Sequence, residues 1–361
     1  MQPLRLSIVV PTFNESRNVP ELVRLLDQTL GATGWEVVFV DDDSPDGTAR
    51  VVRKLAVSDA RVRCVQRVGR RGLSTACIEG MLASSAPVIA VMDADLQHDE
   101  RILPRMLALA EADAEVVVAT RYAEGGSTGD WDASRKLMSR LATRVSHWVL
   151  RQAVSDPMSG FFMLRRSLLD DCVPQLSGLG FKILLDLLAS AERPVKLTEV
   201  PYTFRDRLHG ESKLDSMVIW EYGMLLADKM VGRWIPVHFL VFSLIGGLGV
   251  LVHLVILTTA MQVFMIAFTT AQSLATILTM VFNFALNNVL TYRDRQLKGW
   301  KWLKGLFSFM IGCSIGAFAN IGIATWLFER DTAWLPAALA GILVGAVWNY
   351  AVTKLYTWGV K

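Results

Sequence analysis

Apolar residues follow two different patterns along the chain. Four short apolar runs in the first part have the length of buried strands: residues 6–10, 35–40, 62–66 and 88–92. Between them, over residues 19–26 and 74–83, apolar residues recur at helical spacing. Because strands and helices alternate, we expect an α/β fold with a doubly wound, mainly parallel sheet.

The second pattern begins at Ile235, after which 58 residues ending at Tyr292 contain no Asp, Glu, Lys or Arg. A membrane helix needs only about 20 residues, so this stretch predicts two spans. Two further apolar stretches follow. We therefore expect an all-α membrane domain with four spans, at about 237–260, 265–290, 305–328 and 333–355.

The segment between the two patterns is amphipathic. Over residues 212–234, apolar side chains recur at helical spacing, and Trp220 and Trp234 are rings of the kind found at membrane surfaces. An ordinary amphipathic helix packed on the first part is the alternative. The sequence thus predicts an α/β domain over residues 1–211, interfacial helices over 212–234 and a transmembrane domain over 235–361.

The distribution of charge agrees with a membrane-embedded second part. Residues 237–361 contain only 8 of the 37 Lys and Arg residues and 3 of the 34 Asp and Glu residues. Five of these cations, between residues 293 and 304, lie in the expected second-to-third connection. The positive-inside rule then places the α/β domain and both termini in the cytoplasm, in a multi-pass protein of the cell (inner) membrane. The start of the chain lacks the pattern of a signal peptide, which agrees.

Other residue types exclude some classes of function and leave one question open. No basic patch indicates nucleic acid, and the four scattered cysteines lack the spacing of a zinc site. Asn side chains in the expected spans predict hydrogen bonds between helices, with a path for a lipid headgroup as the alternative. They are Asn283, Asn287, Asn288, Asn320 and Asn349.

The main candidate for chemistry follows the fourth predicted strand. Asp93 and Asp95 stand one residue apart where the apolar run ends, and Gln97 comes two residues later. Carboxyl ends of parallel strands are where open α/β sheets bind ligands. These oxygens suit one hard cation, Mg²⁺ or Mn²⁺, shared with a diphosphate. The alternative is that the two carboxylates merely end a turn.

Polar residues also follow the first two strands. Glu15 is placed to accept from ribose hydroxyls, and Asp42 from a base N–H, although each residue alone is at least as consistent with a helix cap or a turn. No glycine-rich fingerprint follows the first strand, and no GxxxxGK[ST] loop is present. A dehydrogenase or a kinase-type phosphate loop is therefore disfavoured.

Seven motifs, in order, resemble the polyprenyl-phosphate glycosyltransferases of the GT-A, family-2 type, closest to the dolichol-phosphate mannose synthases. The motifs are VPTFNE (10–15), VDDDS (40–44), GLSTA (72–76), DADLQH (93–98), DPMSGF (156–161), GFK (180–182) and RLHGESK (207–213). Residues 237–361 resemble the GtrA-type membrane domain. The family often has Gly at the position of Ser74 and Glu at that of Asp186, so the approach of the first loop to the donor and the role of Asp186 stay open.

The resemblance implies a set of site residues. Asp93, Asp95 and Gln97 would hold the metal. The nucleotide-sugar site would consist of Pro11, Phe13, Glu15, Val40, Asp42, Asp93, Ala94, Lys182, Arg207 and Lys213. Lys213 also lies directly before the amphipathic segment, where the headgroup of an acceptor lipid would surface.

An acceptor phosphate brings its own chemical demands. Its second pKa is about 6, so it is mostly ionised at pH 7 and no general base is required. Cations are needed to bring one anion up to another. Arg121 and Arg135 are the candidates for the acceptor phosphate, with Ser159 as a further donor; solvated surface charges and a turn hydroxyl are the alternatives. Asp95 completes the expected catalytic set.

Several functions compete. The first is inverting transfer of one sugar, by resemblance mannose from GDP-mannose, to a polyprenyl or dolichyl phosphate at the cytoplasmic face; glucose from UDP-glucose is the runner-up. A processive synthase is disfavoured because Met230 stands where a Gln-x-x-Arg-Trp motif requires Gln. A lipid-linked sugar carrier or scaffold with a vestigial soluble domain is a different class. The sequence leaves the oligomeric state open.

Overall fold

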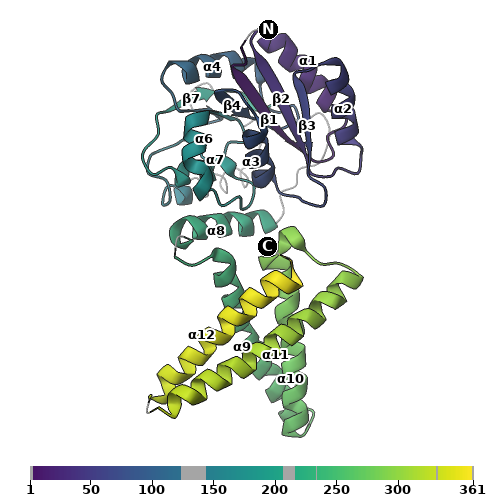
Figure 1. Cartoon of the computed structure of the whole chain (residues 1–361), viewed down its shortest axis with the longest axis vertical. Helices are drawn as coiled ribbons and strands as arrows, with labels where there is room; N and C mark the ends of the chain where they lie inside the picture. The colour runs from purple at the N-terminus through teal and green to yellow at the C-terminus, as the bar shows by residue number, and fades with distance from the viewer. Residues whose placement is uncertain (1–2, 123–143, 206–215, 233, 331, 360–361) are drawn as a thin grey trace. The chain divides into compact units, whose positions relative to one another are not determined.

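The structure is a computed structural model that describes residues 3–122, 144–205, 216–232, 234–330 and 332–359. The chain divides into two compact units, Met1–Arg233 and Trp234–Lys361 (Figure 1). Three of the predicted site residues, Arg135, Arg207 and Lys213, lie outside the described residues.

The first unit is built around a sheet. Its described strands follow the order β3-β2-β1-β4-β6-β5-β7, and among them only β6 runs antiparallel to its neighbours. The mainly parallel α/β fold is therefore confirmed. The strands are β1 Leu6–Thr12, β2 Trp35–Asp41, β3 Val62–Gln66, β4 Val88–Val91, β5 Val116–Thr120, β6 Phe162–Arg165 and β7 Leu197–Pro201.

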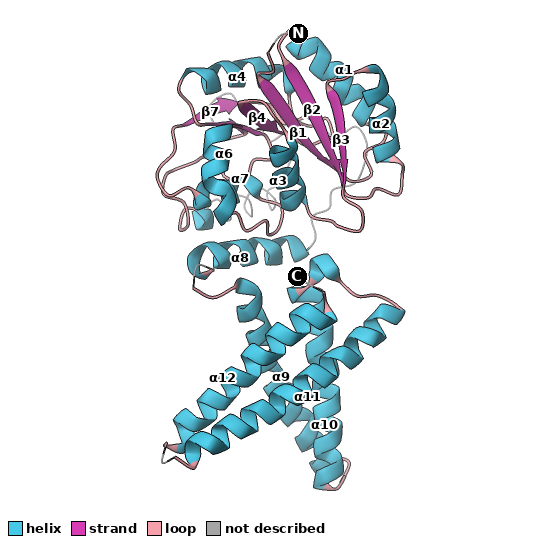
Figure 2. Ribbon diagram, viewed as in Figure 1, coloured by secondary structure: helices cyan, strands magenta, loops and turns pink. Residues whose placement is uncertain are grey.

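Helices cover both faces of this sheet (Figure 2). Alternate residues of β1 point to opposite sides, so Leu6 and Ile8 join the core under α1, α2 and α4, while Val9 joins the core under α3, α6 and α7. The helices are α1 Val19–Leu30, α2 Thr48–Ser58, α3 Leu73–Ala83, η1 Glu100–Ile102, α4 Leu103–Ala112, α6 Arg166–Cys172, η2 Val173–Gln175 and α7 Ile183–Ser190.

Helix α3 approaches the sheet closely at Gly80. A Cβ on this residue would lie 2.4 Å from Val9 Cγ1 and 2.7 Å from Val40 Cγ2. Such distances are shorter than side-chain contacts allow, so only glycine permits this spacing. The close packing holds the first turn of α3 beside the carboxyl ends of the strands.

Helix α8, Ser216–Val231, belongs to the first unit. Its Met224 and Leu225 are buried, whereas Ile219 and Met230 are 58% and 60% exposed. One side of the helix thus packs on the catalytic unit, and other apolar side chains remain uncovered. Part of the predicted segment 212–234 lies outside the described residues.

The second unit is helical. Three of its helical stretches are long and apolar enough to cross a membrane: Val237–Gln262, Phe268–Thr291 and Trp300–Phe328. A further helix covers Trp334–Val352, and its role as a fourth span stays a prediction. The elements are α9 Val237–Gln262, α10 Phe268–Leu286, the π-helical turn η3 Asn287–Thr291, the 3₁₀ turn η4 Arg293–Arg295, α11 Trp300–Phe328, α12 Trp334–Val352 and the π-helical turn η5 Thr353–Thr357.

Helix α11 begins earlier than the sequence predicted. Its first residue is Trp300, so Lys301 and Lys304 stand on its first turns and not in a loop. Lysine is a good helix former, and Gly299 with φ +55° marks the turn before the helix. The lysines therefore occupy fixed positions on one helix.

The two hairpins of this unit, α9–α10 and α11–α12, end in the same way. Asn283, Asn287 and Thr291 precede Tyr292 at the spacing at which Asn349, Thr353 and Thr357 precede Trp358. Both ends form a π-helical turn, and the rings of Tyr292 and Trp358 stack with centroids 4.1 Å apart. The chain thus repeats one hairpin design twice.

Asn288 makes hydrogen bonds with Trp358 and Leu297, which lie just outside the helices, so hydrogen bonding of the Asn residues from helix to helix stays a prediction. Its Oδ1 accepts from Trp358 Nε1 at 3.2 Å and from Leu297 N at 2.8 Å, so it joins one hairpin to the other. Asn287 differs, because its Nδ2 donates to Asn283 O within the same helix.

Candidate active site

A pocket of about 360 Å³ lies where β1, β2 and β4 end. It brings together seven of the predicted nucleotide and metal residues, which come from three strand ends. The lining residues are Pro11, Thr12, Phe13, Glu15, Asp42, Arg71, Gly72, Leu73, Asp93, Ala94 and Asp95. Because the strands are parallel, their carboxyl ends meet at one edge of the sheet, which explains this convergence.

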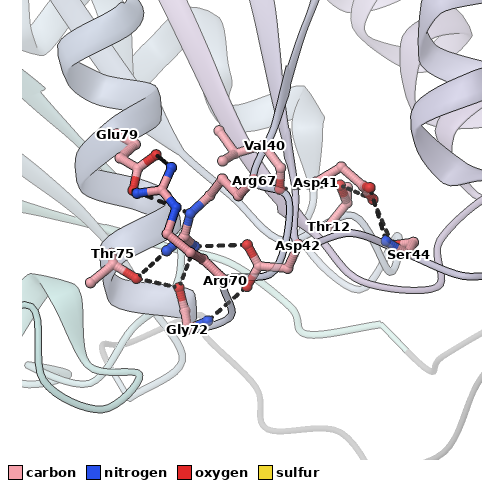
Figure 3. A network of polar contacts seen from close by, with 10 residues as sticks. All are labelled: Thr12, Val40, Asp41, Asp42, Ser44, Arg67, Arg70, Gly72, Thr75 and Glu79. Atoms are coloured by element: carbon pink, nitrogen blue, oxygen red, sulfur yellow. Dashed lines mark hydrogen bonds and ion pairs between the residues drawn. The ribbon is translucent and has the colours of Figure 1, made fainter. Parts of the chain in front are cut away.

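Asp42 is held rigidly in the pocket wall. Its Oδ1 accepts from Arg67 Nη1 and its Oδ2 from the backbone N–H of Gly72, both at 2.7 Å (Figure 3). Burial raises the pKa of Asp42, while the Gly72 and Arg67 contacts oppose that rise. Arg67 also donates to Thr75 Oγ1 at 2.6 Å and so ties β2 to the first turn of α3.

Glu15 has the helix-cap surroundings that were its alternative interpretation. Its Oε2 accepts from Asn18 Nδ2 at 2.6 Å, and its backbone N–H donates to Thr48 Oγ1 at 3.0 Å. Its side chain still lines the pocket. Glu15 can therefore both support the start of the helix and line the pocket, because one carboxylate has lone pairs for several donors.

The backbone is left-handed after each of the three strands that end at the pocket. Asn14, Asp43 and Leu96 have φ values of +62°, +56° and +64°. This conformation costs a residue other than glycine about 1–3 kcal/mol, and such strain is concentrated at functional sites. Leu96 stands between Asp95 and Gln97, so the bend lies within the predicted metal motif.

Asp93 and Asp95 occupy different surroundings. The Asp93 side chain is 39% exposed, whereas Asp95 is buried and its Oδ1 accepts from the backbone N–H of Gln97 at 3.2 Å. The backbone N–H of Asp93 donates to His98 Nδ1 at 3.1 Å, and His98 Nε2 lies 3.7 Å from Asp93 Oδ2. Burial lowers the pKa of His98, against the opposing charges of Asp93 and Asp95, so this ring is a neutral support of the motif.

The residues present suit a hard cation, with one reservation about Gln97. Two carboxylates reach the same pocket, and such oxygens are the ligands that Mg²⁺ and Mn²⁺ prefer. Gln97 Nε2 donates to Arg205 O at 3.0 Å, and Gln97 does not line the pocket. Within the described residues no group of three His, Cys, Asp or Glu side chains is placed to hold a metal. The protein thus offers two carboxylates and leaves the remaining positions to other oxygens.

Arg121 lies in a buried ion pair. Its Nε and Nη2 donate to Asp156 at 2.8 and 3.0 Å, and only 10% of the Arg121 side chain and 1% of the Asp156 side chain are exposed. The edge of the guanidinium that binds bidentately is therefore occupied. Its contact with a phosphate stays a proposal.

The Ser159 hydroxyl, which was predicted as a phosphate donor, hydrogen-bonds to the backbone in this structure. Its Oγ–H donates to Ala119 O at 2.7 Å, and the residue is buried. The hydroxyl therefore fastens the 156–161 loop to β5. Lys182 lies nearby, with its Nζ donating to Met158 O at 3.3 Å.

Val40, which was predicted for the nucleotide site, does not line the pocket. Its side chain is fully buried in the core against Gly80, and its carbonyl accepts from Thr12 Oγ1 at 3.2 Å. A valine inside a strand points into the sheet packing, so it supports Asp42 without reaching the pocket. Ser74 is likewise fully buried and does not line the pocket.

The structure adds residues that the sequence analysis missed. Arg71 lines the pocket with its guanidinium 4.3 Å from the centre of the Phe13 ring. Arg67 hydrogen-bonds to the Asp42 carboxylate, and His98 accepts from the backbone N–H of Asp93. The only signal for Arg71 was its place directly before the Gly72 motif, since a lone exposed arginine is not distinctive.

Comparisons with known proteins agree with this geometry. Residues 7–173 match the family described as glycosyl transferase family 2, and residues 241–358 match the GtrA/DPMS transmembrane domain. A dolichol-phosphate mannosyltransferase of Pyrococcus furiosus is 32% identical over 357 residues, which cover 98% of this chain and 99% of that protein.

Two eukaryotic relatives match a shorter part. The dolichol-phosphate mannosyltransferase of Saccharomyces cerevisiae is 36% identical over 63% of this chain and 88% of its own length. That of Mycosarcoma maydis is 33% identical over 66% of this chain and 84% of its own length. A solved glucosyl-3-phosphoglycerate synthase of Mycobacterium tuberculosis is 18% identical over 64% of this chain and 78% of that chain, with a TM-score of 0.46, too distant to support an argument.

Proposed function

Because the chain belongs to the family-2 glycosyltransferases that carry a GtrA-type membrane domain, we propose that it transfers one mannosyl group from GDP-mannose to a polyprenyl or dolichyl phosphate. It is a membrane-bound glycosyltransferase. The observation that carries the proposal is the pocket at the ends of β1, β2 and β4, which joins two acidic metal-ligand candidates to a rigid carboxylate for a base. The name of the full-length relative supports mannose and the lipid acceptor.

The pocket favours a guanine base on chemical grounds. Asp42 is fixed by Arg67 and Gly72, and each of its oxygens keeps a second lone pair. Guanine presents two adjacent N–H donors on one edge, whereas uracil presents one. Glu15 would accept from the ribose hydroxyls, and Arg71 would contact the diphosphate from the rim beside Phe13.

Asp93 and Asp95 would hold Mg²⁺ or Mn²⁺, with Gln97 as the third proposed ligand. Such an ion neutralises the diphosphate and makes it a better leaving group. His98 fixes the backbone at Asp93, and the backbone N–H of Gln97 fixes the Asp95 carboxylate. Both ligands are thus oriented before the donor binds, which is what efficient electrostatic stabilisation requires.

The acceptor needs no base, because a phosphomonoester is mostly ionised at pH 7. One of its oxygens forms a bond to the anomeric carbon as the bond from that carbon to the diphosphate breaks, so the configuration inverts. Arg121 and Arg135 are the proposed contacts for the acceptor phosphate. Lys182, Arg207 and Lys213 are proposed as further cations around the two substrates.

The proposed topology places this pocket in the cytoplasm. The cations between residues 293 and 304 support an orientation in which that connection and both termini are cytoplasmic. The exposed Ile219 and Met230 of α8 support contact between this helix and the membrane surface. A water-soluble donor and a lipid-bound phosphate would then meet at one interface.

The test is a transfer assay with the purified full-length chain. Radiolabelled GDP-mannose and UDP-glucose are each offered with a short polyprenyl phosphate, and labelled lipid is extracted and counted. We expect product from GDP-mannose, and none from the Asp95→Asn variant. Product from UDP-glucose alone would replace the proposed sugar. Binding of lipid-linked sugar by folded protein without any transfer would instead support a carrier.

A further inference from the structure

A second pocket lies wholly within the membrane unit, between α11 and the π-helical turn η5. Its volume is about 220 Å³. Lys301 and Lys304 contribute cations, and Ser308, Tyr356 and Thr357 contribute hydroxyl groups. Neither this pocket nor its residues take part in the proposed transfer reaction.

The two lysines are positioned as a pair. They stand three residues apart on α11 and therefore on the same side of the helix. In the part of the chain that the structure describes, neither the Lys301 nor the Lys304 side chain makes a hydrogen bond or an ion pair. Like charges at this spacing repel each other by about 0.2–0.5 kcal/mol, so a bound anion would relieve the repulsion.

Hydroxyl groups lie beside these cations. Ser308 Oγ lies 3.1 Å from Thr357 Oγ1, and Thr357 is the last residue of η5. Gly305 lies between the lysines and Ser308, and a Cβ there would come within 2.3 Å of Leu297 Cδ1. Glycine at this position therefore allows α11 to pack closely against Leu297 and Phe284 beside the pocket. The π-helical turn is itself a feature that often accompanies binding sites.

Comparison of the two hairpins shows that the lysines of the pocket have no counterpart in the first hairpin. The first hairpin ends in the equivalent turn η3, yet no Lys or Arg occurs anywhere from Ile235 to Tyr292. Within the helices and π-helical turns themselves, cations therefore occur only in the second copy, whereas Arg293 and Arg295 follow η3. Closure of a hairpin by a π-helical turn does not by itself require lysines.

The surroundings of the pocket indicate a lipid. Phe307 on α11 and Leu355 on η5, next in sequence to lining residues, are 71% and 51% exposed. Tyr356 at the rim is 77% exposed, and such rings favour the headgroup level of a bilayer. An occupant must therefore combine an anionic group with hydrocarbon on both helices, as the two-chain lipids that surround a membrane protein do.

We propose that this pocket binds the phosphate of an anionic membrane phospholipid, with Lys301 and Lys304 as its cationic contacts and the Ser308 and Thr357 hydroxyls as further donors. Basic pockets between membrane helices bind anionic headgroups in this way. The site would fix the second hairpin to the lipid headgroups at the end of the spans that carries the lysines.

The test uses the full-length chain in detergent and native mass spectrometry with added phosphatidylglycerol. We expect Lys301→Gln and Lys304→Gln each to weaken binding about fivefold, and the double variant about 25-fold, since each lysine contributes comparably to attraction at a lipid surface. Lys298→Gln removes the same charge from an exposed neighbour outside the pocket and should leave binding unchanged. Ser308→Ala, which removes no charge, should weaken binding less.

Three results would overturn the proposal. One is equal binding of phosphatidylglycerol by the wild type and the double variant. Another is equal binding of phosphatidylcholine, which has no net charge. The third is displacement of phosphatidylglycerol by equimolar short polyprenyl phosphate, which would assign the pocket to the acceptor lipid. The transfer assay on the same samples reports separately on the proposed function, because these lysines lie outside the donor pocket.

Discussion

Lys229 of α8 places its Nζ 2.5 Å from Asp186 Oδ1 of α7, and only 8% and 0% of these side chains are exposed. The same carboxylate accepts from Ser177 N, Ser177 Oγ and Gly178 N. One buried ion pair therefore connects the amphipathic helix to the loop before α7. That loop reaches α3, since Gly180 O accepts from Ser74 N at 3.4 Å. Asp186 thus links α8 to the helix that borders the donor pocket.

Removing one partner of this ion pair should be far worse than removing both. Asp186→Ala leaves the buried Lys229 ammonium with its hydrogen bonds to Gln175 O and Ser190 Oγ but without a counter-charge, and such a loss costs about 3–5 kcal/mol in similar buried pairs. Asp186→Leu combined with Lys229→Met restores an apolar contact and should recover most of that loss. Unfolding of the first unit in denaturant, followed by tryptophan fluorescence, measures both. The exposed pair Lys196–Asp113 is the matched control, and Lys196→Met should cost less than about 1 kcal/mol.

Equal destabilisation by Asp186→Ala and Lys196→Met would show that the Asp186 pair is not buried in solution. A double variant no more stable than Asp186→Ala would assign the loss to the Ser177 and Gly178 hydrogen bonds instead.

The second prediction concerns the metal. Asp95→Asn should abolish sugar transfer, because Asn lacks the negative charge. Thermal unfolding should stay close to that of the wild type, because Asn keeps an oxygen that accepts from the backbone N–H of Gln97. Transfer by the wild type should stop in chelator and return with Mn²⁺ or Mg²⁺. Undiminished turnover by Asp95→Asn, or in chelator, would remove Asp95 and the metal from the mechanism.

Residues that follow strands were predictable, because periodicity alone locates a strand and its end. Asp93, Asp95 and Asp42 each lie within three residues of the end of an apolar run of strand length, and parallel strands bring such ends together. The alternation of strands and helices likewise gave the mainly parallel fold. These inferences need only local sequence and the rule for parallel connections.

Partners distant in the sequence were not predictable. Nothing near Asp186 identifies Lys229, and nothing near Arg121 identifies Asp156, yet each pair decides what its members can do. The burial of Ser159 and Val40 was missed for the same reason, since packing between elements determines it. A motif names residues that matter without saying which of them touch the substrate.

The third prediction is a pH dependence of stability. The hydrogen-bonded Arg193 guanidinium holds the pKa of Glu115 at about 2, against an ordinary value of 4.5. A carboxyl whose pKa is lower in the folded state stabilises it fully above the unfolded pKa and loses this effect as pH falls through the folded value. Stability from Glu115 should therefore decline between about pH 4.5 and pH 2. In the Glu115→Gln variant, the midpoint of unfolding should depend less on pH over this range.

Asp113→Asn supplies the control for that measurement. Asp113 is 76% exposed, so removing its charge should leave the slope between pH 2 and 4.5 nearly unchanged. A slope that is the same in wild type and Glu115→Gln would mean that Arg193 does not hold this carboxylate in solution.

The last prediction tests the repeated hairpin. A Cβ on Gly316 of α11 would lie 1.9 Å from Asn349 Oδ1 of α12, and one on Gly249 of α9 would lie 2.4 Å from Asn283 Oδ1 of α10. In each hairpin, the absence of a side chain on the glycine thus leaves room for the Asn side chain of the other helix. Gly316→Ala and Gly249→Ala should each destabilise the second unit by about 1–3 kcal/mol, the usual effect of overpacking.

The matched controls are Gly322→Ala on α11 and Gly246→Ala on α9, where a Cβ would meet nothing within 4 Å. There the added methyl group only raises helix propensity, by up to about 1 kcal/mol, so the expected change is small or stabilising. The four variants are measured by thermal unfolding of the full-length chain in one detergent. Stability changes of opposite sign would separate the effect of helix packing from that of helix propensity. Loss of stability at Gly316 without loss at Gly249 would mean that the two hairpins, despite their common sequence spacing, do not pack by the same contact.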